Sequence, residues 1–218
     1  MKDIPIFTTT AGTASLLLRE IPYKKTACVF IRTVLPGGLE TVLSDCRDFC
    51  LQAGAERVLV TADQPLDLPL DHDLLELSRP KSGLPFLDKP VPLEPLTWEN
   101  ASAYQTVYNR LFAAISTAAT CDNSELSRLI PSGTAFLTRV DGSPAGIGAV
   151  QGCELRAVGV LPEYRGLGRR LTLTLLEKLD GPELFLSVAS TNKPALRLYE
   201  RLGFQMRRVL GSWYCLTG

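Results

Sequence analysis

The sequence predicts an α+β fold, in which a mixed, mostly antiparallel central sheet is flanked by helices and preceded by a smaller N-terminal domain of β-β-α-β order. Three observations predict it. Short runs rich in valine, leucine and isoleucine alternate with amphipathic segments along the chain. Residues 154–204 read as a strand, a glycine- and arginine-rich turn, a helix, a strand and a second helix. A proline-rich segment at residues 62–95 separates the two parts.

The composition is that of an ordinary globular protein. The chain has 218 residues, of which 45% are hydrophobic and 21% charged, and its formal net charge is zero. This balance gives no reason to expect nucleic-acid binding. No apolar run approaches the roughly 18 residues that span a bilayer, and the N-terminus has no secretory signal pattern. We therefore expect a cytoplasmic protein without a nucleic-acid or membrane partner.

The cysteines and the single histidine give little sign of metal or nucleophilic chemistry. Cys46 and Cys50 lie four residues apart and share a face of a predicted helix, but no histidine or second cysteine pair completes a zinc set. We expect six free thiols, mostly buried, and no metal. His72 is expected at the surface, at the start of a short helix, so a Ser-His-Asp triad is poorly supported.

The first half predicts a small α/β domain. Residues 13–20 and 26–34 have the apolar and β-branched composition of the two strands of a hairpin. Apolar residues at spacings of three and four predict an amphipathic helix at 39–52, which Gly54 ends. Residues 57–61 predict a short buried strand.

This order of elements returns in the second half. Val34-Leu-Pro, a glycine turn, a helix and a strand parallel Val160-Leu-Pro and the elements that follow it. Duplication and chance both explain the likeness. The first copy lacks an arginine in its turn, so we expect the first half to be structural, regulatory or substrate-shaping and to hold no second cofactor site.

Prolines recur throughout residues 62–95 and break regular structure there, except for a short helix predicted around 71–78. We place the domain boundary near residue 88. It divides the chain into an N-terminal α/β domain at 1–88, interpreted as a degenerate half-copy without a cofactor site, and a second domain at 89–218. A proline-rich linker is stiff, so the halves keep a defined relation.

The second domain predicts a longer series of elements. Prolines place its first strand at a sheet edge, Thr97 is a candidate N-cap, and Asp141-Gly142 is a strong hairpin signal. In order, the elements are an edge strand at 91–96, helices at 97–116 and 122–129, strands at 134–140, 145–151 and 153–161, a helix after the glycine turn, a strand at 183–188, a helix after Asn192, and terminal strands at 204–210 and 212–216.

The turn after the strand at 153–161 has the features of an anion site. Gly166 and Gly168 permit tight turns and close approach of a ligand to the backbone. The helix that follows presents its free N–H groups here, where its dipole favours negative charge. Arg165, Arg169 and Arg170 add positive charge. A phosphate or pyrophosphate would fit this turn.

This part of the chain resembles the GCN5-related N-acetyltransferase (GNAT) family. The positions that match its fingerprint are Val160, Pro162, Arg165 and Gly168 in the turn motif and Asn192, Ala195, Tyr199, Gly203 and Phe204 in the later motif. Arg170 departs from the pattern, which has glycine or alanine there, and Arg169 stands where the family usually has an aliphatic residue. The Arg170 side chain either obstructs the ligand or swings out to pair with phosphate.

The resemblance implies a GNAT-like sheet, acetyl-CoA as co-substrate and roles for particular residues. The turn, with Leu167 inside it, would hold the pyrophosphate. Val158 and Val160 would pair with the pantetheine arm through their main chain. Asn192 would contact the cofactor while it caps its helix.

Two residues are candidates for catalysis on the same ground. The hydroxyl of Tyr199 would face the CoA sulfur and stabilise the departing thiolate; with a reference pKa near 10 for tyrosine against about 8.5 for a thiol, it donates a hydrogen bond more readily than a proton. Glu154 would act as the base, often through water; the alternative is a solvated carboxylate at the start of a strand. Strand alternation puts Arg156 on the same face as Glu154, at a spacing expected to allow only a loose pair.

We therefore expect an N-acetyltransferase of class EC 2.3.1, which moves an acetyl group from acetyl-CoA to a small-molecule or peptide amine by direct attack. No cysteine occupies the motif, so no covalent enzyme intermediate is expected. The alternative is a catalytically degenerate acyl-CoA-binding or structural module. The sequence is compatible with a homodimer and does not identify the amine.

Overall fold

The computed structural model describes residues 4–217. The chain divides into two compact units. The first extends to Leu75 and includes Ala189–Thr191 and the segment from Val209 onward. The second comprises Glu76–Val188 and Asn192–Arg208. The two units are groups of residues that contact one another, and each contains more than one segment of the chain. They do not test the single boundary predicted near residue 88, which stays a prediction.

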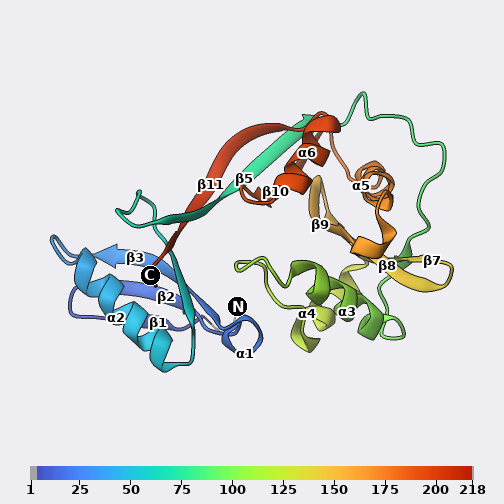
Figure 1. The fold of residues 1–218 in the computed structure, drawn as a ribbon. Helices are drawn as coiled ribbons and strands as arrows, with labels where there is room; N and C mark the ends of the chain where they lie inside the picture. The colour runs from blue at the N-terminus through green and yellow to red at the C-terminus, as the bar shows by residue number, and fades with distance from the viewer. Residues whose placement is uncertain (1–3, 218) are drawn as a thin grey trace. The chain divides into compact units, whose positions relative to one another are not determined.

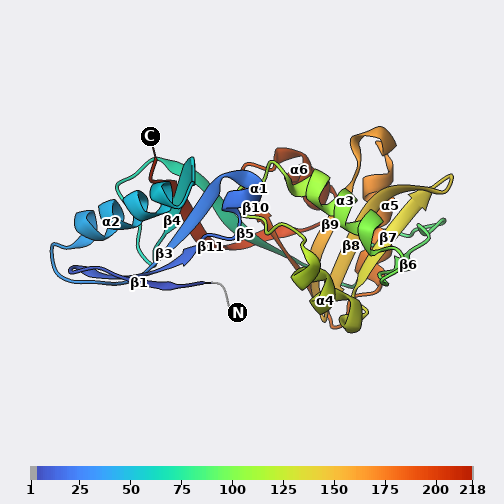
Figure 2. The ribbon, with the colours of Figure 1, turned by 90° about the horizontal axis from the view of Figure 1, so that it is seen from below.

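The first unit is a sheet covered on one face by helix α2 (Figures 1 and 2). Strands β1, β2 and β3 are antiparallel neighbours, and α2 connects β3 to β4, which lies parallel to β3. The predicted hairpin, helix and strand are confirmed, with a short helix α1 between the hairpin strands. The elements are β1 (Ile6–Thr8), β2 (Gly12–Leu17), α1 (Ile21–Lys24), β3 (Thr26–Val34), α2 (Leu39–Gln52) and β4 (Arg57–Thr61).

The core of this unit lies between α2 and the sheet. Val42, Cys46 and Cys50 of α2 are fully buried and form one apolar cluster with residues of β2, β3 and β4. The shared face predicted for the two cysteines is therefore the core face. All six cysteines are free, and four of them are buried.

The second unit has an antiparallel series of strands β6, β7, β8 and β9, then β10 parallel to β9. Helix α5 connects β9 to β10, and α6 follows β10. The elements are β6 (Glu94–Pro95), α3 (Ala101–Phe112), α4 (Asn123–Ser132), β7 (Ala135–Val140), β8 (Ser143–Gln151), β9 (Glu154–Val160), the 3-10 turn η1 (Pro162–Tyr164), α5 (Leu167–Glu177), β10 (Glu183–Ala189) and α6 (Lys193–Arg201).

Alternate residues of β8 show how helices cover both faces of this sheet. Ile147 and Ala149 pack in a buried cluster with residues of α3 and α4. Gly146 and Gly148 face α5 instead: a Cβ at residue 148 would lie 2.3 Å from a methyl carbon of Leu175. The two glycines therefore let α5 approach the strand closely.

Two long strands, β5 (Leu70–Pro80) and β11 (Gln205–Cys215), each have residues in both units. The C-terminal end of β11 pairs antiparallel with β4, with Tyr214 opposite Val60. The first unit is therefore ordered β1-β2-β3-β4-β11, and in the second unit β5 lies next to β10 in the order β5-β10-β9-β8-β7-β6. This mixed, mostly antiparallel sheet with flanking helices confirms the predicted fold class.

The helix predicted at residues 71–78 is wrong, because this segment is part of strand β5. Apolar residues at three- and four-residue spacing suited a helix, but the segment lies between β10 and β11 in the strand order, and those partners decide its conformation. His72 is consequently buried, with 4% of its surface exposed. Its Nδ1 lies 2.7 Å from Asp71 Oδ2, and its ring stacks on Trp213 at 6.4 Å. The expected surface position of His72 is also wrong.

Other differences concern the ends of elements. The helix predicted at 97–116 is shorter, because Asn100 rather than Thr97 precedes α3, and the Asn100 side chain accepts a hydrogen bond from the Thr97 N–H at 2.9 Å. Asp122 caps α4, since its side chain accepts a hydrogen bond from the Glu125 N–H at 2.9 Å. The two predicted terminal strands are one continuous strand, β11.

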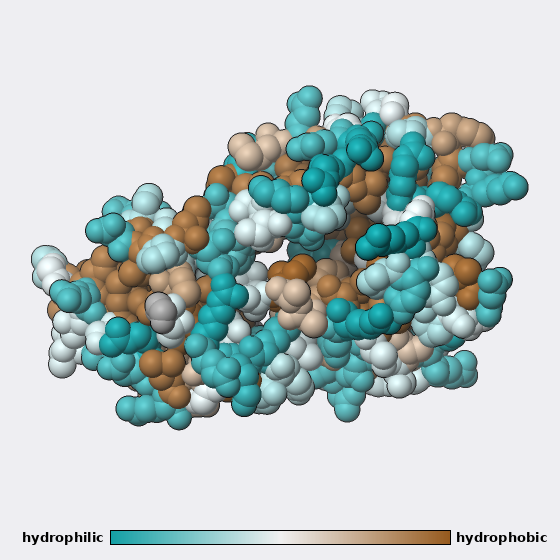
Figure 3. Space-filling model, viewed as in Figure 1, coloured by the Kyte–Doolittle hydropathy of each residue, from teal (hydrophilic) through white to brown (hydrophobic). Residues whose placement is uncertain are grey.

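Both units contain three antiparallel strands, a helix and a parallel strand, in the orders β1-β2-β3-α2-β4 and β7-β8-β9-α5-β10. The likeness read from the sequence therefore extends to topology; duplication itself stays a prediction. Figure 3 shows hydrophobic residues scattered among hydrophilic ones over the face in view. Among residues 4–217, no helix has the length and apolarity needed to cross a membrane.

Candidate functional site

The candidate site begins where two parallel strands of the second unit part. β9 and β10 pair only at Glu154 with Phe185 and at Leu155 with Leu186, and no later pair joins them within the described residues. On its other side β9 stays paired with β8 as far as Val160. The backbone of β9 at residues 156–160, which includes Val158 and Val160, therefore has one edge without a strand partner. Such an edge can add an extended ligand by main-chain hydrogen bonds.

The glycine turn lies at the end of this edge, where it leads into α5. Gly166 is the N-cap of α5, with a φ of 97°, and no side chain caps the helix. A Cβ at residue 166 or 168 would meet no atom within 4 Å. The first N–H groups of α5 therefore begin in an open turn, with the helix dipole favouring an anion.

Arginine side chains surround the turn. Arg165 and Arg169 are exposed, and neither has a hydrogen-bond or ion-pair partner within residues 4–217. Leu167 and Gly168, which stand between them, are half-buried. Two unpaired cations beside uncapped helix amides suit a pyrophosphate, which carries several negative charges.

Arg170 makes a different set of contacts from its two neighbours. Its Nε and Nη2 donate to the carbonyl oxygen of Lys89 at 3.2 and 2.9 Å. The Val91 N–H donates to Thr174 Oγ1 at 3.0 Å. The segment before β6 is thus fastened to α5 at two points one turn apart, and the Arg170 guanidinium holds this segment.

Helix α6 carries the second motif. The Asn192 side chain accepts a hydrogen bond from the Ala195 N–H at 3.3 Å, with Pro194 in the first turn, so the predicted cap is confirmed. Two turns later, Tyr199 is buried, and its ring packs edge-to-face on Phe204 at 5.9 Å. Burial raises the pKa of Tyr199 from 10.0 to about 12, because the phenolate would lose its hydration.

The Tyr199 hydroxyl is the free end of this buried side chain. It has no hydrogen-bond partner within the described residues. Among the described residues, the Tyr104 hydroxyl is the one side-chain polar atom that is both fully buried and without a partner. The Tyr199 hydroxyl also lacks a partner, so it is not fully buried and has some contact with solvent. A protonated phenol with an accessible, unpartnered O–H is suited to donate a hydrogen bond to a ligand.

Glu154 lies away from the turn, where β9 is still paired with β10. Six residues separate it from Val160, which is about 20 Å along an extended strand. Both of its carboxylate oxygens lie 2.9 Å from Arg156 Nη1. The expectation of only a loose pair is wrong, because two side chains on one face of a strand are near enough for a long arginine to fold back. The catalytic role of Glu154 stays a prediction.

Sequence reasoning missed two cations that support this site. Arg79 is buried, and it donates to the carbonyl oxygens of Pro80 at 2.8 Å, Ser82 at 3.3 Å and Leu202, the C-cap of α6. Lys81 Nζ donates to the carbonyl of Leu179, just after α5. Residues 79–81 therefore hold the C-terminal ends of both α5 and α6. No sequence signal marks either residue, since both precede the recognisable motifs.

Comparison with known proteins places these features in a family. The model of the family described as "Acetyltransferase (GNAT) family" matches residues 93–204, just over half of the chain. The chain is similar to the N-alpha-acetyltransferase RimI of Mycobacterium tuberculosis, with 39% identity over 67 residues, covering 30% of this chain and 42% of RimI. It is similar to a mycothiol acetyltransferase of a Nocardioides species, with 44% identity over 75 residues, covering 31% of this chain and 25% of that protein.

The chain thus spans less than half the length of these two relatives. Among solved structures, a GCN5-related N-acetyltransferase from Kribbella flavida has a similar fold, with a TM-score of 0.61 and 15% identity, covering 100% of this chain and 91% of that one. The family match includes the parted strands, the open turn and both site helices. The chain belongs to the acetyltransferase (GNAT) family.

Proposed function

We propose that this protein transfers an acetyl group from acetyl-CoA to an amine. The observation that carries the proposal is the free edge of β9 that leads into the open, arginine-flanked start of α5. This arrangement offers hydrogen bonds to an extended amide arm and then positive charge to a pyrophosphate, in the order in which CoA presents them. Membership of the family, and relatives named as acetyltransferases, support the same chemistry.

In this proposal acetyl-CoA is a substrate that supplies an activated thioester carbonyl. The main chain of residues 156–160 holds the pantetheine arm. The α5 amides with Arg165 and Arg169 hold the pyrophosphate, and Asn192 lies at the start of the neighbouring helix α6. Arg170 supports the site through Lys89 and is not required as a phosphate ligand.

Tyr199 acts on the sulfur. As the neutral amine attacks the carbonyl carbon, the C–S bond breaks and its electron pair moves to sulfur. A Tyr199 pKa of about 12 keeps the phenol protonated, so it donates a hydrogen bond to the developing thiolate. The amine loses one proton in the reaction. Glu154, which forms an ion pair with Arg156, is the candidate to receive it through water.

A second candidate function is acyl-CoA binding without turnover. The observation that favours it is the position of Glu154, which is paired with Arg156 at the closed end of β9. A chain that binds the thioester but removes the amine proton poorly would serve as an acyl-CoA-binding module.

Calorimetry with acetyl-CoA and with CoA tests the first step, and free-thiol release with a panel of amines tests the second. The panel includes peptides with free α-amines, as the name of the RimI relative suggests, and small-molecule amines. Binding with thiol release and an acetylated amine detected by mass spectrometry supports acetyl transfer. Binding without turnover on any amine supports the module, and no binding of either ligand contradicts both.

A further inference from the structure

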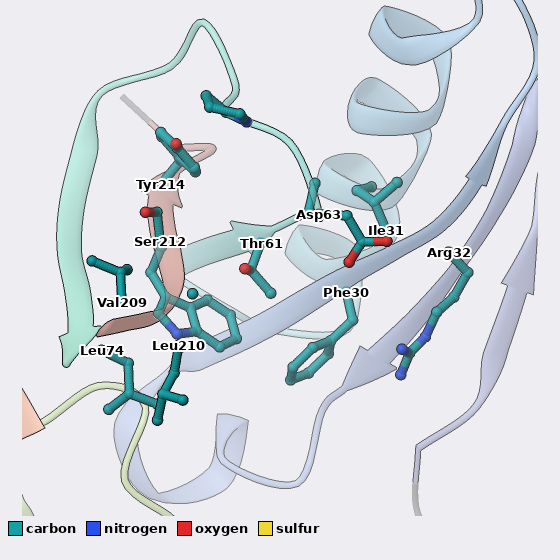
Figure 4. A pocket seen from close by; sticks show the side chains of 14 residues that line it. Phe30, Ile31, Arg32, Thr61, Asp63, Leu74, Val209, Leu210, Ser212 and Tyr214 are labelled. Atoms are coloured by element: carbon teal, nitrogen blue, oxygen red, sulfur yellow. The ribbon is translucent and has the colours of Figure 1, made fainter. Parts of the chain in front are cut away.

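The first unit has a pocket of its own, with a volume of about 580 Å³. It lies at the carboxyl ends of the parallel strands β3 and β4, where small ligands commonly bind in α/β sheets. The pairing of the two strands ends at Phe30 with Thr61, although β3 continues to Val34. The residues around this end line the pocket, together with the C-terminal part of β11 (Figure 4). Its volume is within the range of small-molecule sites.

A held arginine stands in the pocket lining. Arg32 Nε donates to Ser15 Oγ at 3.0 Å, and Ser15 is buried, with 6% exposure. The guanidinium carbon lies 5.7 Å from the centre of the Phe30 ring. Nη1 and Nη2 have no partner within the described residues. The bond to Ser15 thus fixes the direction of the guanidinium and leaves its two terminal nitrogens for a carboxylate, which they can bind in a bidentate manner.

A free carboxylate accompanies it. Asp63, two residues after the end of β4, lines the same pocket. It has no hydrogen-bond or ion-pair partner in the part of the chain that the structure describes, Arg32 included. Figure 4 shows the Asp63 and Arg32 side chains on the same side of the pocket. Two opposite charges that do not neutralise each other are complementary to a ligand that carries both an ammonium and a carboxylate group.

The other side of the pocket has apolar side chains together with Ser212 and Tyr214. Figure 4 shows Leu74, Val209 and Leu210 there, across from Asp63 and Arg32. Val209 and Leu210 are 47% and 42% exposed, a large share for aliphatic side chains at a pocket. Trp213 also lines the pocket and is held edge-to-face by Phe30 at 5.2 Å. This wall would gain from covering by a hydrocarbon group.

We infer that this pocket binds a free α-amino acid with an apolar side chain. Arg32 holds its carboxylate, Asp63 holds its ammonium group, and apolar side chains of the pocket lining contact its side chain. An α-amino acid is the smallest common ligand that combines the two opposite charges with an apolar group on one carbon. The inference stands on the first unit alone and does not depend on acetyl transfer by the second.

Fluorescence of Trp213 in the full chain tests the inference. The protein has two tryptophans, and Trp98, which is 62% exposed, lies outside the pocket lining. Trp98→Phe therefore leaves Trp213 as the single reporter. In the absence of acetyl-CoA, L-leucine should give a saturable change. L-leucinamide lacks the carboxylate, and N-acetyl-L-leucine lacks the ammonium charge. Each should bind with an affinity at least roughly tenfold lower than that of L-leucine.

Charge-removing variants then assign each contact. Arg32→Gln should remove the preference for L-leucine over L-leucinamide, and Asp63→Asn should remove the preference for L-leucine over N-acetyl-L-leucine. Arg47→Gln and Asp45→Asn, on α2 in the same unit, are matched controls and should keep both preferences. Circular dichroism of each variant, compared before titration, confirms that the fold is retained.

Calorimetry with L-leucine and L-phenylalanine accompanies the fluorescence, so that binding without a fluorescence change is detected. The inference is overturned if neither amino acid binds at concentrations up to tens of millimolar, or if the blocked derivatives bind equally well. It is also overturned if acetyl-CoA displaces L-leucine from an Arg165→Ala variant, because the pocket would then be a second cofactor site.

Discussion

The Arg79 guanidinium donates to the carbonyl of Leu202, the residue that ends helix α6. Arg79 lies on β5, well before the region that the family model matches, yet it holds the helix that carries Tyr199. It also lies against Gly203, where a Cβ would be 3.3 Å from Arg79 Nη1 and where φ is 83°. Gly203, the glycine of the family motif, therefore has a backbone conformation that favours glycine, and Arg79 leaves little room for a side chain there.

Arg79→Met should lower the free energy of unfolding by about 1–3 kcal/mol, because three carbonyls lose a charged donor in a buried setting. Urea unfolding measures this change. If α6 also moves, kcat for acetyl transfer should fall more than the KM for acetyl-CoA rises. Arg201→Gln, an exposed change on the same helix, is the control and should alter neither quantity. A fully stable Arg79→Met protein would show that these hydrogen bonds contribute little.

Arg165→Ala should weaken CoA binding by roughly tenfold or more, because it removes an unpaired cation beside the α5 amides. Arg170→Ala should leave the affinity unchanged or improve it, since that guanidinium is engaged by Lys89. Calorimetry with CoA compares the two, with Arg197→Ala on α6 as a control. A large loss of affinity at residue 170 would identify Arg170 as a ligand of the phosphates.

Tyr199→Phe should fold normally, because the hydroxyl has no partner within residues 4–217. Its kcat should fall by about 10²-fold, the lower end of the range for loss of an acid-base group, while CoA affinity is retained. Steady-state kinetics and calorimetry on the same preparation separate the two effects. Unchanged kcat would remove Tyr199 from the proposed chemistry and leave it a packing residue.

Alkaline pH should destabilise the protein partly through Tyr199. Its folded-state pKa is raised to about 12 from 10.0, so the folded protein keeps a proton that the unfolded chain loses. This contribution is fully present below pH 10 and is lost as the pH rises to about 12, and it is on the order of 1–3 kcal/mol. The wild type should therefore lose more stability than Tyr199→Phe between pH 9 and about 11.5. Equal losses in urea unfolding would contradict the burial of the phenol.

Gly148→Ala should destabilise the second unit, because its Cβ would lie 2.3 Å from a carbon of the fully buried Leu175. The expected cost is about 1–3 kcal/mol, typical of overpacking. Gly168→Ala is the matched control for stability, since a Cβ there meets no atom within 4 Å. The same control should weaken CoA binding if the ligand approaches that backbone. Thermal unfolding and calorimetry read the two effects separately.

Local sequence signals predicted the elements whose conformation is determined by their own residues. The helix at 39–52 has an apolar face, Asp141-Gly142 forms its hairpin turn with both residues at positive φ, and Asn192 caps α6. Strand β5 could not be read in this way. Its pattern of apolar residues fits a helix as well, and only β10 and β11, which are distant in sequence, select the strand.

The same limit applies to the site. The turn and the α6 motif were found because their residues are consecutive, and the structure confirms where they lie. The contacts of Arg79 and of Arg170 join segments more than 80 residues apart, so no local pattern reveals them. The chemical roles of Tyr199 and Glu154, the amine and a homodimer stay predictions.

Strands β5 and β11 each have residues in both units, and this limits how the chain can be shortened. A polypeptide that stops after α6 would keep every residue of the family motifs, yet β4 would lose the partner at Tyr214 and Cys215 and become a bare edge open to aggregation. One that begins at residue 89 would lack Arg79 and Lys81, and with them the donors that hold both site helices. The contacts that support the fold of this protein therefore extend beyond the motif that defines its family.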